Sequence, residues 1–402
     1  MAQAAKGPFN PTVIVAVCFC IAALEGYDIQ AFGIAAPRLA RELHLGPSQM
    51  GLAGSAAMVG LMLGAVIGGW FAERSGRKPV LAVSVAAFGV FSVATAFAHS
   101  FEVLTLTRFL TGVGFGGAMP NLIAIATEIS SPNRRAVTTT SMFCGLPAGG
   151  ALVALLARAG GEAMDWRVIF LIGGALPILL APVVLALIPE TRPEQAADAD
   201  QRLGRGLFAE RRAIATLLIW LVFILDLLVT YLLVNWLPTL VQAKGFSPGD
   251  GASTSLWFNA LSVVGALILG RVTDRFGFRW TATLVFLVLA AAMYGLAQAT
   301  TMPAILAFAG AAGFTVVGGA YVLYALAPSF SPPQIRAAAA GVAIAVGRIV
   351  SIAGPVIAGQ LRAAGYGPGQ VLQAMIPVSI AAAGVVFLLL TVGKPHSDGP
   401  AP

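Results

Sequence analysis

Hydrophobic residues occur along this chain in long runs, and short polar stretches separate one run from the next. Each run is about 20 residues long, the length that an α-helix needs to cross the hydrocarbon core of a bilayer. The pattern therefore predicts an all-α membrane protein with twelve spanning helices, over residues 11–36, 49–72, 79–98, 101–126, 137–157, 166–188, 213–237, 253–272, 280–297, 303–327, 337–361 and 370–392.

One polar stretch is much longer than the others. It lies between the sixth and seventh predicted helices, over residues 189–212, and it mixes Glu, Asp, Gln and Arg. This stretch divides the helices into six and six. We expect a six-helix bundle over residues 1–188, a cytoplasmic linker over 189–212 and a second six-helix bundle over 213–402.

The two halves contain a repeat. The loop Gly69-Trp-Phe-Ala-Glu73-Arg74-Ser-Gly76-Arg77-Lys78 follows the second predicted helix, and Gly270-Arg-Val-Thr-Asp274-Arg275-Phe-Gly277-Phe-Arg279 follows the eighth, 201 residues later. The same offset relates Glu25 to Asp226 and Pro37 to Pro238. Parallel repeats are typical of secondary transporters, whose substrate sites lie between the repeats near the bilayer midplane. The repeat predicts two pseudo-symmetric bundles with a site between them.

Composition and charge agree with a multi-pass membrane protein. Hydrophobic residues make up 58% of the chain and charged residues only 10%, against about a quarter charged in soluble domains. Of the 24 Lys and Arg residues, sixteen lie in loops or termini on one side of the predicted membrane and six in loops on the other. This bias predicts that both termini and the linker are cytoplasmic, in the cell's inner membrane. The net charge of +7 is thus a topology signal, and no nucleic-acid partner is expected.

Two carboxylates interrupt the first predicted helix. Glu25 and Asp28 are three residues apart, so they lie on one helix face, with Phe32 on the same face. Placing a charge at this depth costs roughly 2.5–3.5 kcal/mol, so the face should turn into the protein. Burial and mutual repulsion favour the protonated form of such a pair, which makes both residues candidates for proton coupling. The alternative is that they pack helices, bonded to Ser, Asn or Arg of neighbours.

Three further charges lie inside predicted helices. Arg348 and Asp226 are near the middle of the eleventh and seventh helices, and Arg108 is nearer the outer end of the fourth. The planar guanidinium of arginine grips a carboxylate with two hydrogen bonds, so Arg348 is the candidate for binding an anionic substrate. The alternative for Arg348 is a structural ion pair with Asp226. His44, His99 and His396 fall in loops or in the tail, so histidine is not the expected proton carrier.

Several chemistries lack the residues that they need. The sequence has no Gly-x4-Gly-Lys-Ser/Thr phosphate loop, so it does not indicate an ATP-driven pump. It has no Cys/His or His/His spacing of a metal site, and its three cysteines all lie in apolar segments. We therefore expect no enzyme activity, no cofactor and no metal.

The loop after the second and eighth predicted helices has the form G-x-x-x-[DE]-R-x-G-x-[RK], and in this it resembles the major facilitator superfamily. A run in the fourth helix, Arg108-Phe-Leu-Thr-Gly112-Val-Gly114-Phe-Gly116-Gly117, resembles the same family. Glu25-Gly-Tyr-Asp28 is similar to the D-G-x-D element of aromatic acid:proton symporters. Within that group, Asn235-Trp236-Leu237-Pro238, Leu323-Tyr324-Ala325-Leu326-Ala327-Pro328 and Ala345-Val346-Gly347-Arg348 are most similar to transporters of 3-(3-hydroxyphenyl)propionate.

The resemblance implies import of an aromatic carboxylate, 3-(3-hydroxyphenyl)propionate or a hydroxybenzoate-like acid, by alternating access and coupled to protons. It implies that Arg108 serves the proton or substrate pathway, although a structural ion pair is equally open. An aromatic acid also needs ring partners and polar contacts, for which the candidates are Tyr27, Tyr231, Asn235, Trp236 and Tyr324. Each aromatic residue could instead belong to the core or to the interfacial belt.

The resemblance also implies that the repeated loop is a latch that closes the cytoplasmic side. An acid in such a loop can cap a helix, and the basic pair can hold acids at another helix end. Glu128 is a possible partner of Arg77, and Arg134 or Arg135 of Glu73. In the alternative, these charges only set topology. The expected latch residues are Gly69, Glu73, Arg74, Gly76, Arg77, Lys78, Glu128, Asp274 and Arg275.

Other functions remain open at this point. A proton antiporter that exports drugs or organic anions would have the same fold. A membrane sensor that binds an aromatic acid would normally carry a larger cytoplasmic domain than residues 189–212. A sodium ion could in principle use Glu25 or Asp28 in place of a proton. We expect a monomer whose partners are the bilayer, protons and a small aromatic acid.

Overall fold

The structure is a computed structural model of the chain, and it describes residues 10–129, 138, 141–161, 163–190, 207–208, 212–331 and 336–392. The chain forms two compact units, Met1–Glu194 and Gln195–Pro402. The linker expected over residues 189–212 lies mostly outside the described residues. The bundle boundaries given above therefore stay predictions.

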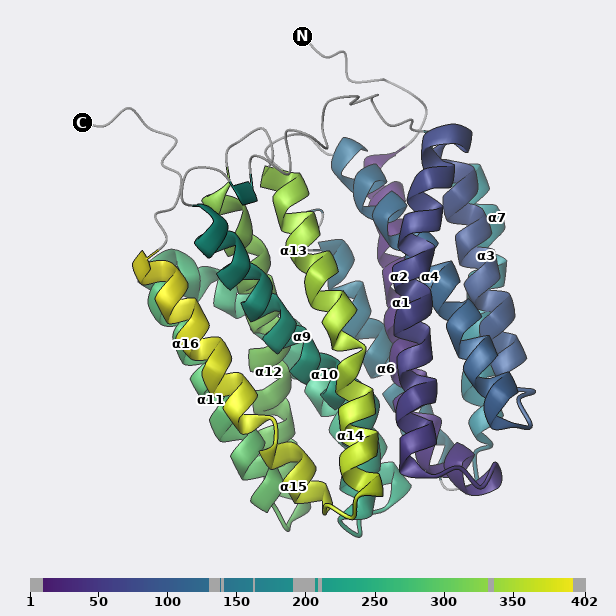
Figure 1. Cartoon of the computed structure of the whole chain (residues 1–402). Coiled ribbons are helices and arrows are strands. Elements are labelled where there is room, and N and C mark those ends of the chain that lie inside the picture. Colours follow the sequence, from purple (N-terminus) through teal and green to yellow (C-terminus); the bar gives the residue numbers. More distant parts are fainter. Residues whose placement is uncertain are drawn as a thin grey trace. The chain divides into compact units, whose positions relative to one another are not determined.

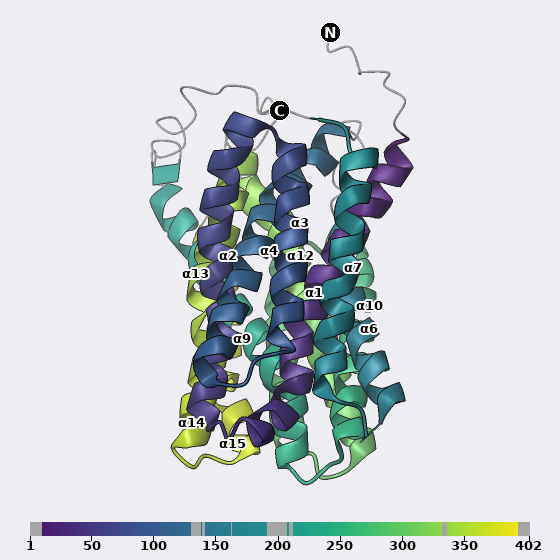
Figure 2. The same ribbon diagram turned by 90° about the vertical axis from the view of Figure 1, so that its right-hand side faces the viewer.

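The first unit is built from long helices that lie alongside one another (Figures 1 and 2). Its closest helix pairs are α2 with α4, α3 with α4, α1 with α6, and α3 with α7. The described helices are α1 (Pro11–Glu42), α2 (Pro47–Ser75), α3 (Arg77–Thr95), α4 (Phe101–Ile129), α6 (Gly145–Gly160) and α7 (Trp166–Leu187).

The second unit has a similar plan with more interruptions. Its most closely packed pairs are α10 with α12, α11 with α12, and α11 with α16. The described elements are α9 (Arg212–Ala243), α10 (Pro248–Phe276), α11 (Phe278–Gln298), α12 (Met302–Leu326), the short 3-10 helix η2 (Ala327–Phe330), α13 (Arg336–Ser351), α14 (Ala353–Ala363), α15 (Pro368–Gln373) and α16 (Ile376–Val392).

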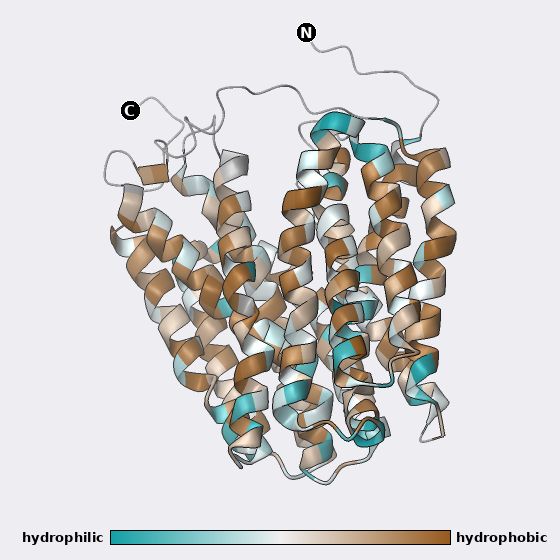
Figure 3. Cartoon of the chain, turned by 45° about the vertical axis from the view of Figure 1, so that its right-hand side comes forward, coloured by the Kyte–Doolittle hydropathy of each residue, from teal (hydrophilic) through white to brown (hydrophobic). Residues whose placement is uncertain are grey.

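Twelve helical segments among the described residues are long and apolar enough to cross a membrane, and each coincides with one of the predicted spans. Hydrophobic residues cover most of the helix lengths, while hydrophilic residues gather at the helix ends and at a few positions within (Figure 3). The predicted all-α membrane fold is confirmed.

The first helix is longer than its hydrophobic run predicts, because α1 continues past Ala36 to Glu42 with Pro37 inside it. Arg38 holds this extension by donating hydrogen bonds to the carbonyl oxygens of Met164 (2.6 Å) and Gly161 (2.7 Å). Glu42 forms an ion pair with Arg167 at the start of α7. Hydropathy therefore located the apolar part of the helix and missed its polar end.

Glycines permit close helix contacts inside the first unit. A Cβ atom added at Gly26 of α1 would collide with the carbonyl oxygen of Leu146, and one added at Gly149 of α6 with that of Ala23. Gly112 of α4 likewise lies against the backbone of Ala57 in α2. Small residues at such crossings let two helix backbones approach closely.

A break divides the eleventh spanning segment. Helix α13 ends at Ser351 and α14 begins at Ala353, just before Gly354 and Pro355. Proline has no N–H group, so Pro355 cannot donate to the carbonyl of Ser351. The break in this spanning segment thus coincides with the Gly-Pro pair.

The repeat found in the sequence reappears in the conformation. Gly76, between α2 and α3, has a φ of 90°, and Gly277, between α10 and α11, has a φ of 78°. Residues that carry a side chain rarely adopt this backbone conformation. Each unit also has an apolar surface groove, between α2, α3 and α4 in one and α10, α11 and α12 in the other. Every residue lining the second groove lies 201 positions after one lining the first, as Val272 follows Phe71 and Leu284 follows Val83.

Candidate functional site

A buried ion pair joins three helices of the first unit. Arg108 of α4 donates from Nη2 to Oδ2 of Asp28 in α1 at 2.8 Å, and the two side chains are 2% and 0% exposed. The other carboxyl oxygen of Asp28, Oδ1, accepts a hydrogen bond of 2.7 Å from the hydroxyl of Ser92 in α3. Both oxygens of Asp28 are therefore engaged, each by a different helix.

The guanidinium of Arg108 is only partly satisfied by this pair. Its Nε and Nη1 atoms are buried and have no hydrogen-bond partner among the described residues. The rings of Phe32 and Phe170 lie 5.6 and 5.7 Å from its central carbon, a distance that permits a weak cation–π attraction. A buried guanidinium with two open donor atoms is an uncommon arrangement, because buried polar groups are usually hydrogen-bonded.

The other predicted residues of the first helix are also buried. Glu25 is 2% exposed and lies one helical turn before Asp28. Tyr27 is 4% exposed, and its hydroxyl donates to the carbonyl oxygen of Ile169 in α7 at 3.0 Å. Its ring also lies against the backbone of Gly173. Packing within the unit accounts for the burial of Tyr27, and its role in substrate binding stays a prediction.

The second unit contains a buried acid of a different kind. Asp226 of α9 is 1% exposed, and neither of its carboxyl oxygens has a hydrogen-bond partner among the described residues. A hydrogen-bonded ion pair between Asp226 and Arg348, the structural alternative raised by the sequence, is therefore not formed. Removing a carboxyl from water without a donor is unfavourable, which makes Asp226 a candidate for binding something that is not part of the chain.

A cluster of aromatic rings lies near this acid. Phe223, one turn before Asp226, stacks on Tyr324 of α12 with ring centroids 5.7 Å apart, and Tyr321 meets Tyr324 edge-on at the same distance. Arg348, Tyr231 and Asp226 all lie close enough to Tyr324 to interact with it electrostatically. The predicted residues Asp226, Tyr231, Tyr324 and Arg348 thus come together from α9, α12 and α13.

Asn235 and Trp236 lie further along α9. Asn235 donates to the carbonyl oxygen of Tyr231 within its own helix, at 2.9 Å. Trp236 donates from Nε1 to the carbonyl oxygen of Pro355 at 3.1 Å. Trp236 thus ties α9 to α14 directly after the helix break, which assigns its polar atom to helix packing.

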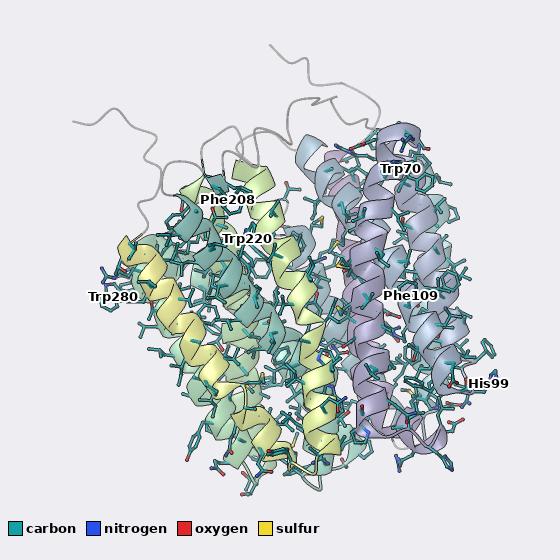
Figure 4. All side chains as sticks on the ribbon, viewed as in Figure 1. Trp70, His99, Phe109, Phe208, Trp220 and Trp280 are labelled. Carbon is teal, nitrogen blue, oxygen red and sulfur yellow. The ribbon has the colours of Figure 1, made fainter. Side chains whose placement is uncertain are left out.

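The repeated loop of the first unit contacts one residue that the sequence analysis did not indicate. Glu190, just after α7, places its carboxylate beside Gly76, and its Oε1 accepts a hydrogen bond from the backbone N–H of Lys78 at 3.4 Å. An acid in this position caps the start of α3. Arg74 stacks over the ring of Trp70, 3.5 Å from its centroid, at the end of the unit opposite to His99 (Figure 4).

The other latch residues stay predictions. The side chain of Glu128, and Arg134 and Arg135, lie outside the described residues. Gly69 has open space around its Cα, and Arg275 lies 5.5 Å from the ring of Phe276. No hydrogen bond or ion pair of Glu73 or Asp274 is found within the described part of the chain.

Four contributing residues escaped the sequence analysis: Ser92, Phe223, Tyr321 and Glu190. Ser92 is a single hydroxyl in an apolar helix, and the two rings look like ordinary core residues. Glu190 begins the polar stretch, where an acid is unremarkable in composition. A search for partners of each intramembrane charge could have proposed Ser92, because the sequence does predict that Asp28 needs a donor.

The described residues contain no cluster of three His, Cys, Asp or Glu side chains that could hold a metal. What they do contain is a charged cluster in each unit, within helices of spanning length. Such clusters can bind a proton or an anionic small molecule.

Solved structures of other proteins have the same fold as the described part of this chain. A bacterial homologue of the human lysosomal transporter Spinster has the same fold, with a TM-score of 0.80 at 17% identity over 97% of this chain and 99% of that one. The xylose transporter XylE from E. coli gives a TM-score of 0.78 at 16% identity over 97% and 98%.

The Major Facilitator Superfamily matches residues 18–266, and the chain belongs to this family of transporters, which are not enzymes. It is 40% identical to the 3-(3-hydroxy-phenyl)propionate transporter of Escherichia coli K12 over 94% of this chain and 93% of that protein. It is 31% identical to the 4-hydroxybenzoate transporter PcaK of Pseudomonas putida over 93% and 91%. The resemblance predicted from the motifs is confirmed.

Proposed function

We propose that this chain imports an aromatic carboxylate together with protons, by alternating access between its two units. The observation that carries the proposal is the buried pair of Asp28 and Arg108, whose guanidinium keeps two donor atoms without partners. A buried ion pair stabilises a protein only if further hydrogen bonds satisfy its remaining donor atoms. Two donor atoms of Arg108 lack such bonds within the described part of the chain, so stability alone does not explain the pair. An incompletely bonded pair can change partners during a transport cycle.

The proton role falls to Asp28 and Glu25. Arg108 compensates a negative charge on Asp28 while the pair is closed. When the pair opens, Asp28 keeps only the hydrogen bond from Ser92, and proton binding then neutralises the carboxyl. Glu25, buried one turn away, is the second proton-binding candidate. Arg108 acts in this proposal as the group that couples proton binding to movement.

The substrate role falls to the second unit. Arg348 binds the carboxylate of the acid, since its charge is permanent and its donors form a planar fork. Tyr324, Phe223 and Tyr321 supply ring contacts, and Asp226, Tyr231 and Asn235 supply polar ones. The relatives that transport 3-(3-hydroxyphenyl)propionate and 4-hydroxybenzoate support an aromatic acid as the substrate.

The remaining elements of the proposal concern topology and gating. We propose that the chain lies in the inner membrane as a monomer, with both termini cytoplasmic. The loop Glu73 to Lys78 acts as the latch of the cytoplasmic side, with Glu190 as its additional partner.

Uptake into proteoliposomes tests the proposal. Radiolabelled 3-(3-hydroxyphenyl)propionate, 4-hydroxybenzoate and benzoate are offered with an inward proton gradient, to the wild type, Asp28→Asn, Glu25→Gln and Arg348→Met. We expect accumulation of at least one acid by the wild type, loss of gradient-driven accumulation in the first two variants, and loss of uptake in the third. His99→Gln, an exposed loop change, serves as the control and should behave as the wild type.

Two results would overturn the proposal. If no acid accumulates while a preloaded cationic dye leaves on the same gradient, the protein is an antiporter. If the acids bind to the purified protein but no flux follows, it is a sensor. Accumulation driven by sodium instead of protons would overturn the coupling alone.

A further inference from the structure

We infer that Asp226 is the acceptor for a hydroxyl group on the aromatic ring, so that the protein selects ring-hydroxylated acids over unsubstituted ones. This inference rests on the proposed function and adds to it the chemical class of the preferred substrate. It gives Asp226 a role distinct from that of Arg348, which binds the other end of the molecule.

The first argument is the state of the carboxyl group. Asp226 is 1% exposed, and both of its oxygens lack hydrogen-bond donors among the described residues. Asp28, a buried acid of the first unit, has donors on both oxygens. A buried acceptor without a donor destabilises the protein unless a ligand supplies one.

The second argument is the surroundings of the acid. The Thr230 hydroxyl donates to the backbone carbonyl of Asp226 at 2.9 Å and leaves the carboxyl oxygens without a donor among the described residues. The ring of Tyr324 lies close enough to interact electrostatically with Asp226, and it stacks on Phe223 with ring centroids 5.7 Å apart and an interplanar angle of 19°. An aromatic ring that carries a donor fits a site that offers flat apolar surfaces and one acceptor.

The third argument is the distribution of charge. Arg348 and Asp226 both interact electrostatically with Tyr324, so a cation and an anion share one neighbourhood. A molecule with a carboxylate at one end and a phenolic hydroxyl at the other complements both groups at once. An acid without the hydroxyl would leave Asp226 buried without a donor, and sites of this kind discriminate strongly against the analogue that lacks the group.

The test is competition for uptake. Unlabelled 3-(3-hydroxyphenyl)propionate and 3-phenylpropionate compete with the radiolabelled hydroxylated acid in proteoliposomes, and the ratio of their half-inhibitory concentrations is measured. The wild type should prefer the hydroxylated acid by about 10- to 150-fold, the range for one hydrogen bond to a charged group. Asp226→Leu should reduce the ratio to about twofold or less, and Asp226→Asn, which keeps an oxygen acceptor, should give an intermediate ratio.

A ratio is independent of how much protein folds, and Asp226→Asn keeps the inference testable if Asp226→Leu fails to insert. Ser379→Ala removes another buried polar group of the second unit and should leave the ratio unchanged. A wild type that accepts both acids equally overturns the inference while the proposed function stands. An Asp226→Asn variant that keeps the full ratio but loses proton-driven accumulation also overturns it, because Asp226 would then bind the proton. If the wild type transports neither acid, the proposed function fails first.

Discussion

Removing one member of the pair of Asp28 and Arg108 should destabilise the first unit more than removing both. In Asp28→Leu, Nη2 of Arg108 loses its partner, and no guanidinium nitrogen then has one among the described residues, since Nε and Nη1 already lack them. An arginine cannot shed its proton to escape the low-dielectric interior. The expected loss is about 3–5 kcal/mol of unfolding free energy, the range for one uncompensated member of a buried pair.

The opposite single change should cost less. In Arg108→Met, Asp28 keeps the hydrogen bond from Ser92 and can take up a proton, so no buried charge has to remain. The double variant Asp28→Leu/Arg108→Met replaces the pair by apolar groups of similar volume. Its stability should be close to that of the wild type, because such replacements of buried pairs are often neutral or stabilising.

The assay is reversible unfolding in detergent micelles, with the coupling energy taken from the double-mutant cycle. The control is the ion pair of Arg167 and Glu42, whose side chains are 34% and 43% exposed; Arg167→Met should cost about 0–1 kcal/mol. Additive losses in the cycle would refute this reasoning, since they would mean that the two groups do not sense each other. Equal losses in the two single variants would refute the argument from protonation.

Two further predictions concern packing. Gly149→Ala should lower the free energy of unfolding by about 1–3 kcal/mol or more and impair transport, because its methyl group would collide with the backbone of Ala23. The control Gly384→Ala, whose methyl group would enter open space, should be neutral or slightly stabilising in the same unfolding assay. The Nζ atom of Lys244 donates to the carbonyl oxygens of Leu296, Ala297 and Ala299 at 2.8 Å each. Lys244→Met should therefore destabilise the second unit by about 1.5–3 kcal/mol for each of these hydrogen bonds that water does not replace. Recovery of stability in Lys244→Arg would support this reasoning, and unchanged stability in Lys244→Met would contradict it.

The sequence predicted the helices better than their ends. Run length and hydropathy report the part of a helix that crosses hydrocarbon, so all twelve spans could be located. The same signal stops where polar residues begin, although α1 continues to Glu42 and α9 continues through Pro238 to Ala243. Contacts such as those of Arg38 with the loop before α7 hold these polar turns, and contacts of this kind are invisible in a single segment.

The site shows the same limit. Charges inside apolar runs identify themselves, which is why Glu25, Asp28, Arg108, Asp226 and Arg348 could be named from the sequence. Their partners depend on the rotation and depth of neighbouring helices. Whether Asp28 meets Arg108 and Ser92, and whether Asp226 meets a donor, could be learned only from the packed helices.

The most direct test of proton-coupled import is to follow the pH inside proteoliposomes while the substrate enters. A trapped fluorescent pH indicator reports the lumen, no gradient is imposed, and 3-(3-hydroxyphenyl)propionate is added outside. The account predicts acidification of the lumen in step with uptake, dependent on the protein and absent in Asp28→Asn. Uptake without acidification, or alkalinisation of the lumen, would contradict proton symport.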